Sequence, residues 1–221
     1  MKNPLTQNTV RSYLAVIAII LIGVSVALFK YAMFGTDPFQ CFMSGMAIVL
    51  SFWSFSLMYF VVSVLQFIAM YIWGRKYIGF ATFVNIFCLG TIIEYSGNFL
   101  SYCLGEQGFA ARMIIFLCGI LLLMFSSALY FTADKGVSTY DFIALTMADK
   151  KVASFRLCRI FTDSVCVIVG LLCGIGFGAG VGVGTIITAF CMGPVIALLR
   201  EKLTDPFLAK FPEQVAVQGD K

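Results

Sequence analysis

The stretch GIGFGAGVGVGTIITAFCMGP, residues 174–194, decides how this chain is organised. Six glycines alternate with apolar residues, and a threonine, a cysteine and a closing Gly-Pro pair follow them. A weaker copy, GFATFVNIFCLG, lies about a hundred positions earlier at residues 79–90, and a fixed offset of this kind indicates an internal repeat. The paired positions are Gly79 with Gly182, Thr82 with Thr185, Phe87 with Phe190, Cys88 with Cys191, and Gly90 with Gly193.

A second pair of segments matches at nearly the same offset. VALFKYAMFGTDPF at 26–39 falls on SALYFTADKGVSTY at 127–140, which pairs Gly35 with Gly136. Two matches in the same order predict a duplicated chain, with chance similarity between apolar segments as the alternative. We expect residues 182–185 and 79–82 to lie near each other across the axis that relates the two halves.

Composition places the chain in a membrane. It is 61% hydrophobic and only 12% charged, whereas about a quarter of the residues in a soluble domain are charged. There is no histidine, and none of the eight cysteines forms a CxxC pair, so we expect reduced, buried cysteines and neither metal nor cofactor. The formal charge of +4 comes from basic loops and tails, so a lipid bilayer and not a nucleic acid is the expected partner, and self-association stays open.

The hydrophobic pattern predicts an all-α polytopic membrane protein with about six transmembrane helices and two short half-helices. About 20 apolar residues are needed to cross a bilayer. The predicted spans are 13–33, 52–73, 79–104, 112–133, 155–177 and 183–199, with a flexible bend at 178–182. The half-helices, 39–50 and 138–148, are too short to cross.

Each half therefore contains three crossings, and this odd number predicts two inverted repeats, at 11–104 and 109–202. Lys and Arg gather on one side of this arrangement, with Arg112 as the exception, so the positive-inside rule predicts cytoplasmic tails at 1–10 and 203–221. The alternative has both short helices spanning, which gives eight crossings and parallel repeats.

The paired turns GTDP and GVST, the segment ALYFTADKGVSTYD and the late motif GVGTIITAFCMGP resemble the bacterial YczE/YitT-type integral membrane proteins. The resemblance covers residues 26–199, and the absence of a soluble C-terminal domain places the chain with the shorter YczE-like branch. It implies a multi-pass protein of the bacterial inner membrane that is often suspected of transport. It supplies no substrate and no catalytic residue.

Polar groups at membrane depth are costly, and they are the candidate substrate-binding residues. They are Glu94, Asp141, Asp37, Asp163, Asn85, Thr188 and Thr185. Each acid also has a structural interpretation: Asp37 as a helix N-cap, Asp141 on a solvated helix face, and Asp163 in an i,i+4 ion pair with Arg159.

Glu94 is the strongest of these candidates, because no basic residue stands three or four positions away. Thr91 and Asn98 share its helical face, so we expect Glu94 to face a polar cavity between the repeats and bind a cation or a proton. The alternative is a buried bond to Lys30 of the first span.

Two classes of function follow. The first is a secondary transporter of a small solute or cation that works by alternating access between the repeats. The second is a non-transporting subunit, such as a substrate-capture or accessory partner of another membrane complex. An enzyme is not expected, because the chain holds no HExxH motif, nucleophile elbow or histidine-based constellation.

Overall fold

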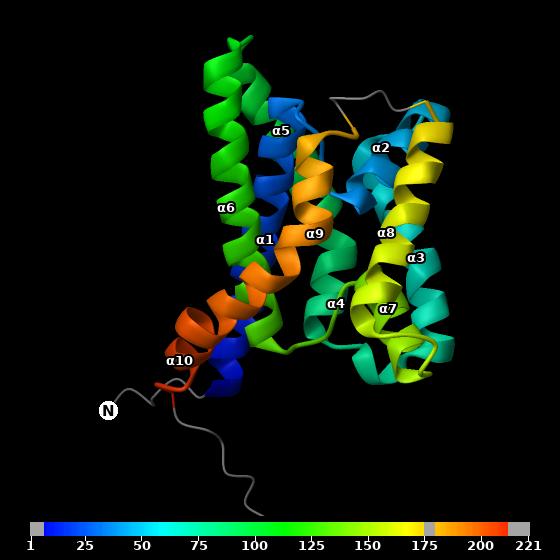
Figure 1. The fold of residues 1–221 in the computed structure, drawn as a ribbon, viewed down its shortest axis with the longest axis vertical. Coiled ribbons are helices and arrows are strands. Elements are labelled where there is room, and N and C mark those ends of the chain that lie inside the picture. Colours follow the sequence, from blue (N-terminus) through cyan, green and yellow to red (C-terminus); the bar gives the residue numbers. More distant parts are fainter. Residues whose placement is uncertain (1–6, 175–179, 212–221) are drawn as a thin grey trace, which may run out of the picture.

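The protein is an all-helical bundle, described by a computed structural model for residues 7–174 and 180–211 (Figure 1). Its elements, in chain order, are α1 (Gln7–Ala32), α2 (Pro38–Val49), α3 (Phe55–Trp73), the 3-10 turn η1 (Arg75–Tyr77), α4 (Phe80–Val84), the π segment η2 (Asn85–Leu89), α5 (Gly90–Leu104), α6 (Phe109–Ala133), α7 (Asp141–Asp149), α8 (Phe155–Leu172), α9 (Val183–Leu199), the π segment η3 (Arg200–Thr204) and α10 (Asp205–Leu208). α4, η2 and α5 follow one another without a break, as do α9, η3 and α10.

Five helical stretches within the described residues are long and apolar enough to cross a membrane, so the chain is a multi-pass membrane protein. They are α1, α3, α4 to α5, α6, and α9 to α10. The 18 residues of α8 include Arg156, Arg159 and Asp163, which lower its hydropathy. The 12 residues of α2 and the 9 of α7 reach only about 18 and 14 Å at the helical rise of 1.5 Å per residue, well short of a bilayer core.

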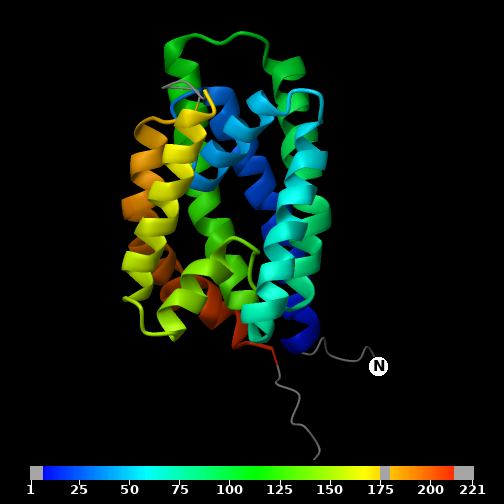
Figure 2. The same ribbon diagram turned by 90° about the vertical axis from the view of Figure 1, so that its right-hand side faces the viewer.

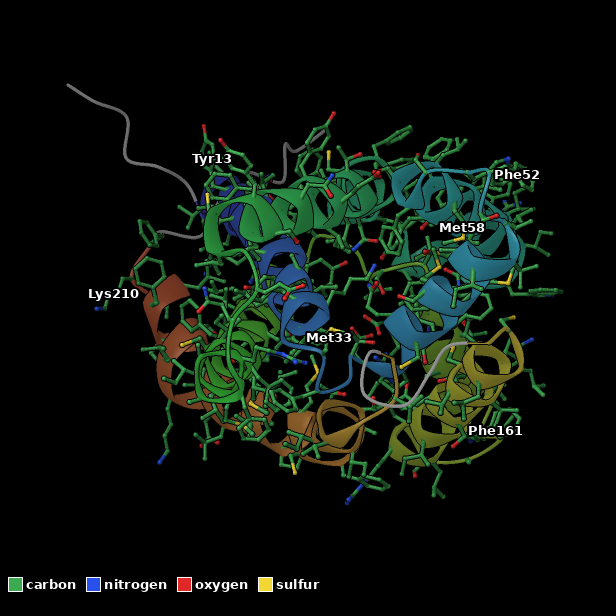
Figure 3. All side chains as sticks on the ribbon, turned by 90° about the horizontal axis from the view of Figure 1, so that it is seen from above. Tyr13, Met33, Phe52, Met58, Phe161 and Lys210 are labelled. Atoms are coloured by element: carbon green, nitrogen blue, oxygen red, sulfur yellow. The ribbon has the colours of Figure 1, made fainter. Side chains whose placement is uncertain are left out.

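The helices form two adjoining groups (Figure 1). α1 packs mainly against α6 and α5, and α9 packs against α6; in the other group α8 packs against α2 and α7. The short helices are enclosed by longer ones, with α2 in the upper half and α7 in the lower half (Figure 2). Seen from above, Tyr13, Phe52 and Phe161 lie on the perimeter, where large apolar side chains are exposed as expected for a surface solvated by lipid (Figure 3).

The turn after α1 packs directly on the start of α9. Gly184 N donates to Phe34 O at 2.9 Å, and Thr185 Oγ1 donates to Thr36 O at 2.7 Å. A Cβ atom added to Gly182 would lie 2.5 Å from Phe34 O, so only glycine permits this approach. This contact joins the first half of the chain to the second.

The turn after α6 packs in the same way on the start of α4. Ala81 N donates to Lys135 O at 2.8 Å, and Thr82 Oγ1 donates to Val137 O at 2.8 Å. A Cβ added to Gly79 would collide with Lys135 O. The paired positions recognised in the sequence therefore make matching contacts, each with the turn from the other half of the chain.

The expectation that residues 182–185 and 79–82 lie near each other is wrong. α9 begins near the upper end of the bundle and α4 near the lower end (Figure 1). Each glycine contacts a turn instead of its counterpart, because sequence similarity identifies equivalent positions and not positions in contact. The turns themselves bend at Gly35 and Gly136, with φ of 97° and 106°, values that favour glycine at both.

Several helix ends differ from the predicted ones. α1 begins at Gln7, ahead of the predicted 13, and α8 ends at Leu172. Residues 175–177, at the end of the span predicted at 155–177, and residues 178–179 of the bend predicted at 178–182 lie outside the described residues. The last helix continues past 199 to Leu208, because Thr132 Oγ1 bonds both Thr204 and Asp205 and so holds this segment against α6.

Candidate functional site

The first turns of the two short helices meet inside the bundle. Asp37 is the N-cap of α2, and its Oδ1 accepts a hydrogen bond from Gln40 N at 3.2 Å. Ser138 Oγ accepts from Asp141 N at 3.1 Å at the start of α7. Helices so capped have fewer of their first N–H groups unsatisfied. The structural interpretation of Asp37 as an N-cap therefore holds, and Ser138 does the same for the second short helix.

The contact between these turns is aromatic. The rings of Phe39 and Tyr140 stack with their centroids 4.6 Å apart and their planes 18° from parallel. Both side chains are buried. The two residues are paired positions in the segments 26–39 and 127–140, so equivalent side chains from the two halves touch here.

Beside this stack lies a partly buried group of charges: the side chains of Asp141 and Asp163 are 15% and 8% exposed, and that of Arg159, at its centre, is 31% exposed. Its Nε lies 3.3 Å from Asp163 Oδ1, one helical turn along α8, and its NH1 bonds Asp141 Oδ1. The guanidinium also lies 4.6 Å from the ring of Tyr140, whose hydroxyl donates to Asp163 Oδ1. One arginine thus faces two carboxylates, so its positive charge is fully balanced within the group. The i,i+4 pair predicted for Asp163 is present, and Asp141 shares the same arginine.

A cavity of about 540 Å³ opens onto the stack and the charged group, a volume within the range of small-molecule sites. Five of the seven candidate residues line it: Asp37, Asp141, Asp163, Asn85 and Thr188. Asn85 is the first residue of the π segment η2, a kind of distortion that frequently marks functional sites. Within residues 7–174 and 180–211, no three His, Cys, Asp or Glu side chains gather as a metal ion would need.

Sequence reasoning missed three residues of this site. Arg159 entered only as the partner of Asp163, although it organises the charged group. Gln40 and Tyr130 line the cavity, are 3% and 4% exposed, and keep Gln40 Oε1 and Tyr130 Oη without a hydrogen-bond partner. The repeat offered a signal for Gln40, which pairs with Asp141 in the alignment of the two halves.

Thr185 and Glu94 are not among the residues that line this cavity. Thr185 is used in the contact with Thr36, as described above. Glu94 Oε2 accepts from both the backbone N, at 2.8 Å, and the Oγ of Ser56, in the first turn of α3. With Thr91 and Asn98 it lines a separate polar hollow, so the expected polar face exists away from Asp37 and Asp141.

Lys30 does not pair with Glu94. Its Nζ lies 3.4 Å from the centroid of the Phe55 ring, and no ion pair within 4 Å joins it to a described carboxylate. Glu94 belongs to α5, but its carboxylate lies at the N-terminus of α3. This position favours a capping role, in which the negative charge also meets the positive end of the α3 dipole.

We therefore expect Glu94→Ala to lower the free energy of unfolding by about 1.5 kcal/mol, the low end for a hydrogen bond to a charged group. Ser56 N would lose its acceptor, and Lys30→Met should not restore the loss, because Lys30 has no ion pair with Glu94. Chemical denaturation of Glu94→Ala and of the Glu94→Ala, Lys30→Met double variant measures the two free energies of unfolding. Recovery of stability in the Glu94→Ala, Lys30→Met protein would contradict the capping role.

At the lower end of the bundle, Asp149 at the end of α7 is tied to the turn after α3. Lys76 Nζ lies 2.5 Å from Asp149 Oδ2, and the Tyr77 hydroxyl donates to the same oxygen. The hydrogen bond from Lys76, followed by that from Tyr77, holds the pKa of the Asp149 carboxyl below its usual value. These exposed contacts fasten the end of one short helix to the other half of the chain.

Comparison with known proteins gives a family but no activity. A model of a family of unknown function, DUF6198, matches residues 9–201. An uncharacterized protein of Haemophilus influenzae is 27% identical over 185 residues, which cover 81% of this chain and 78% of that protein. No solved structure matches.

Proposed function

Because the chain belongs to the DUF6198 family of unknown function, its activity has to be argued from its own site, and we propose that it is a secondary transporter of a small solute. The observation that carries the proposal is the cavity of about 540 Å³ where the first turns of α2 and α7 meet. Transporters built from inverted repeats bind their substrate near the bilayer midplane, at the ends of discontinuous helices. Two observations support this comparison: the two halves of the chain make matching contacts, and the short helices α2 and α7 begin beside the cavity.

The topology we propose has six crossings, two half-helices and two inverted repeats, with both termini in the cytoplasm of a bacterial cell. α8 is the sixth crossing, and two of its charged residues, Arg159 and Asp163, pair with each other at the cavity. The matching contacts of Gly182 and Gly79 with the two turns support the repeat, and their opposite ends of the bundle support its inversion. We also propose a relationship to the YczE/YitT-type proteins, on the paired turns at 35–38 and 136–139.

The contacts around the cavity suggest how access to it alternates between the two sides of the membrane. Thr36 N donates to Gly180 O at 3.0 Å and Cys41 Sγ donates to the same oxygen, so the turn before α2 is held against the residues that precede α9. Phe155 of α8 and Ala197 of α9 line the cavity, and both are exposed. These two helices pack mainly against different neighbours, α2 and α7 for α8 and α6 for α9, so they can separate or close without breaking a shared interface.

Cysteine accessibility tests this mechanism. Ser127 of α6 lines the cavity and is buried, so Ser127→Cys in a background without reactive native cysteines reports on the site. We expect an impermeant thiol reagent to modify it from either side of the membrane, in right-side-out and in inverted vesicles. Gly108→Cys and Lys150→Cys mark the two sides, and each should react only from one, Lys150→Cys from the cytoplasm.

Two results would contradict the proposal in different ways. Labelling of Lys150→Cys from outside would overturn the topology. Labelling of Ser127→Cys from one side only, unchanged under all conditions, would contradict alternating access and favour a fixed binding subunit of a larger complex.

A further inference from the structure

Among the described residues around the cavity, one carboxylate has no basic partner. Asp141 and Asp163 share Arg159, whereas Asp37 has no basic side chain within 4 Å among the described residues. The other arginine of the lining, Arg156, is exposed to the surroundings. An anionic solute would therefore find the charge of the partly buried Arg159 already neutralised, and a cationic solute would find a carboxylate that no described basic side chain neutralises.

Two buried polar atoms of the same lining also lack partners. Buried polar groups are almost always hydrogen-bonded, so those that face a cavity indicate groups that a ligand satisfies. Gln40 Oε1 is an acceptor only, and Tyr130 Oη both donates and accepts. Gln40 is in the first turn of α2, three residues after Asp37. This end of the cavity therefore presents two acceptors, the Asp37 carboxylate and Gln40 Oε1, which a positively charged hydrogen-bond donor would satisfy.

The remaining wall is aromatic. Phe39, Tyr59, Tyr130 and Tyr140 contribute to it. Arg159 and Phe39 already lie against the ring of Tyr140, and the faces of such rings carry negative potential that attracts ammonium groups. The stack of Phe39 on Tyr140 also provides an apolar surface for a hydrocarbon body. Aromatic rings beside a carboxylate suit an organic cation better than a bare metal ion, which needs several oxygen ligands.

We propose that the solute is a small organic ammonium ion, held by Asp37 and Gln40 at its charged end and by the aromatic rings along its apolar part. This rests on the proposed function for transport, but binding itself does not depend on it. The helix N-terminus of α2 does not compete for an anion, because Asp37 already caps it.

The test uses three probes of one shape on the purified full chain: 2-phenylethylammonium, 3-phenylpropionate and 2-phenylethanol. We expect only the ammonium ion to raise the Tm in a concentration-dependent way, because only a ligand that binds the folded state stabilises it. Asp37→Asn should weaken its Kd at least tenfold without unfolding the protein, because asparagine caps a helix as well as aspartate does. Asp134→Asn is the matched control: its side chain is 85% exposed, and the Kd should not change.

The outcomes separate the ligand class from transport. Equal stabilisation by the anion or the alcohol, no binding of the ammonium ion, or wild-type affinity in Asp37→Asn would each overturn the amine site. Counterflow of labelled 2-phenylethylammonium in proteoliposomes then tests transport: binding without counterflow would support the site and contradict the transporter. Counterflow of the anion or alcohol alone would support a transporter and overturn the amine.

Discussion

Replacement of Gly79 or Gly182 with alanine is expected to lower the free energy of unfolding by about 3 kcal/mol, at the upper end of the usual cost of overpacking. The backbone of both glycines is extended, with φ of −152° and −167°, a conformation open to alanine. The loss comes instead from the added methyl group, which would collide with the carbonyl of Phe34 or Lys135. A carbonyl in a tight turn cannot rotate away as a flexible side chain can.

Gly97→Ala is the matched control for these variants. Gly97 lies within α5, and a Cβ there meets no atom within 4 Å. Alanine favours a helix over glycine by up to about 1 kcal/mol, so this variant should be neutral or more stable. Denaturation of the three proteins in the same detergent gives the comparison. Equal free energies of unfolding for Gly97→Ala and Gly182→Ala would contradict a collision between the added methyl group and the carbonyl of the turn.

Arg159→Gln is expected to cost about 1.5 to 3 kcal/mol, the range for hydrogen bonds to charged groups, because it leaves two mostly buried carboxylates uncompensated while the partial exposure of Arg159 lets water screen the rest. Here Asp141 and Asp163 would both lose their partner, although Tyr140 would still donate to Asp163. The Arg159→Gln, Asp141→Asn double variant should recover part of the lost free energy of unfolding, as the same denaturation measurement would show.

Arg156→Gln makes the same chemical change one turn earlier on α8. Arg156 is exposed and forms no ion pair with a described residue, so the free energy of unfolding should change by at most about 0.5 kcal/mol. If Arg159→Gln and Arg156→Gln had the same free energy of unfolding, Arg159 would not be the centre of the charged group that includes Asp141 and Asp163.

The sequence predicted equivalence well and contact poorly. The offset between the halves paired Gly35 with Gly136 and Thr82 with Thr185, and the two threonines form matching hydrogen bonds with the residues that follow the two glycines. The same offset could not reveal that each threonine meets the opposite turn, since an alignment carries no direction in space. The i,i+4 spacing of Arg159 and Asp163 was sufficient for their ion pair, because one helix fixes both ends of it.

The acid that the sequence favoured lies apart from the cavity for a similar reason. Glu94 has no basic neighbour on its own helix, but its partner is a backbone N–H at the start of α3, and backbone donors leave no trace in a sequence. Gln40 and Tyr130 were missed because their importance depends on what they fail to contact. Satisfaction of a polar atom is a property of the packed bundle and cannot be read from spacing.

The crossed contacts of the two turns have a consequence for biosynthesis. At 5–20 residues per second the ribosome makes Gly35 on the order of ten seconds before Gly182, against which Gly35 packs in the finished protein. Gly79 likewise waits for Lys135. The first half therefore enters the bilayer with both glycine surfaces uncovered, and neither half can complete its own packing before the other has been inserted. The contacts that fix the two turns therefore form only after the second half has been inserted.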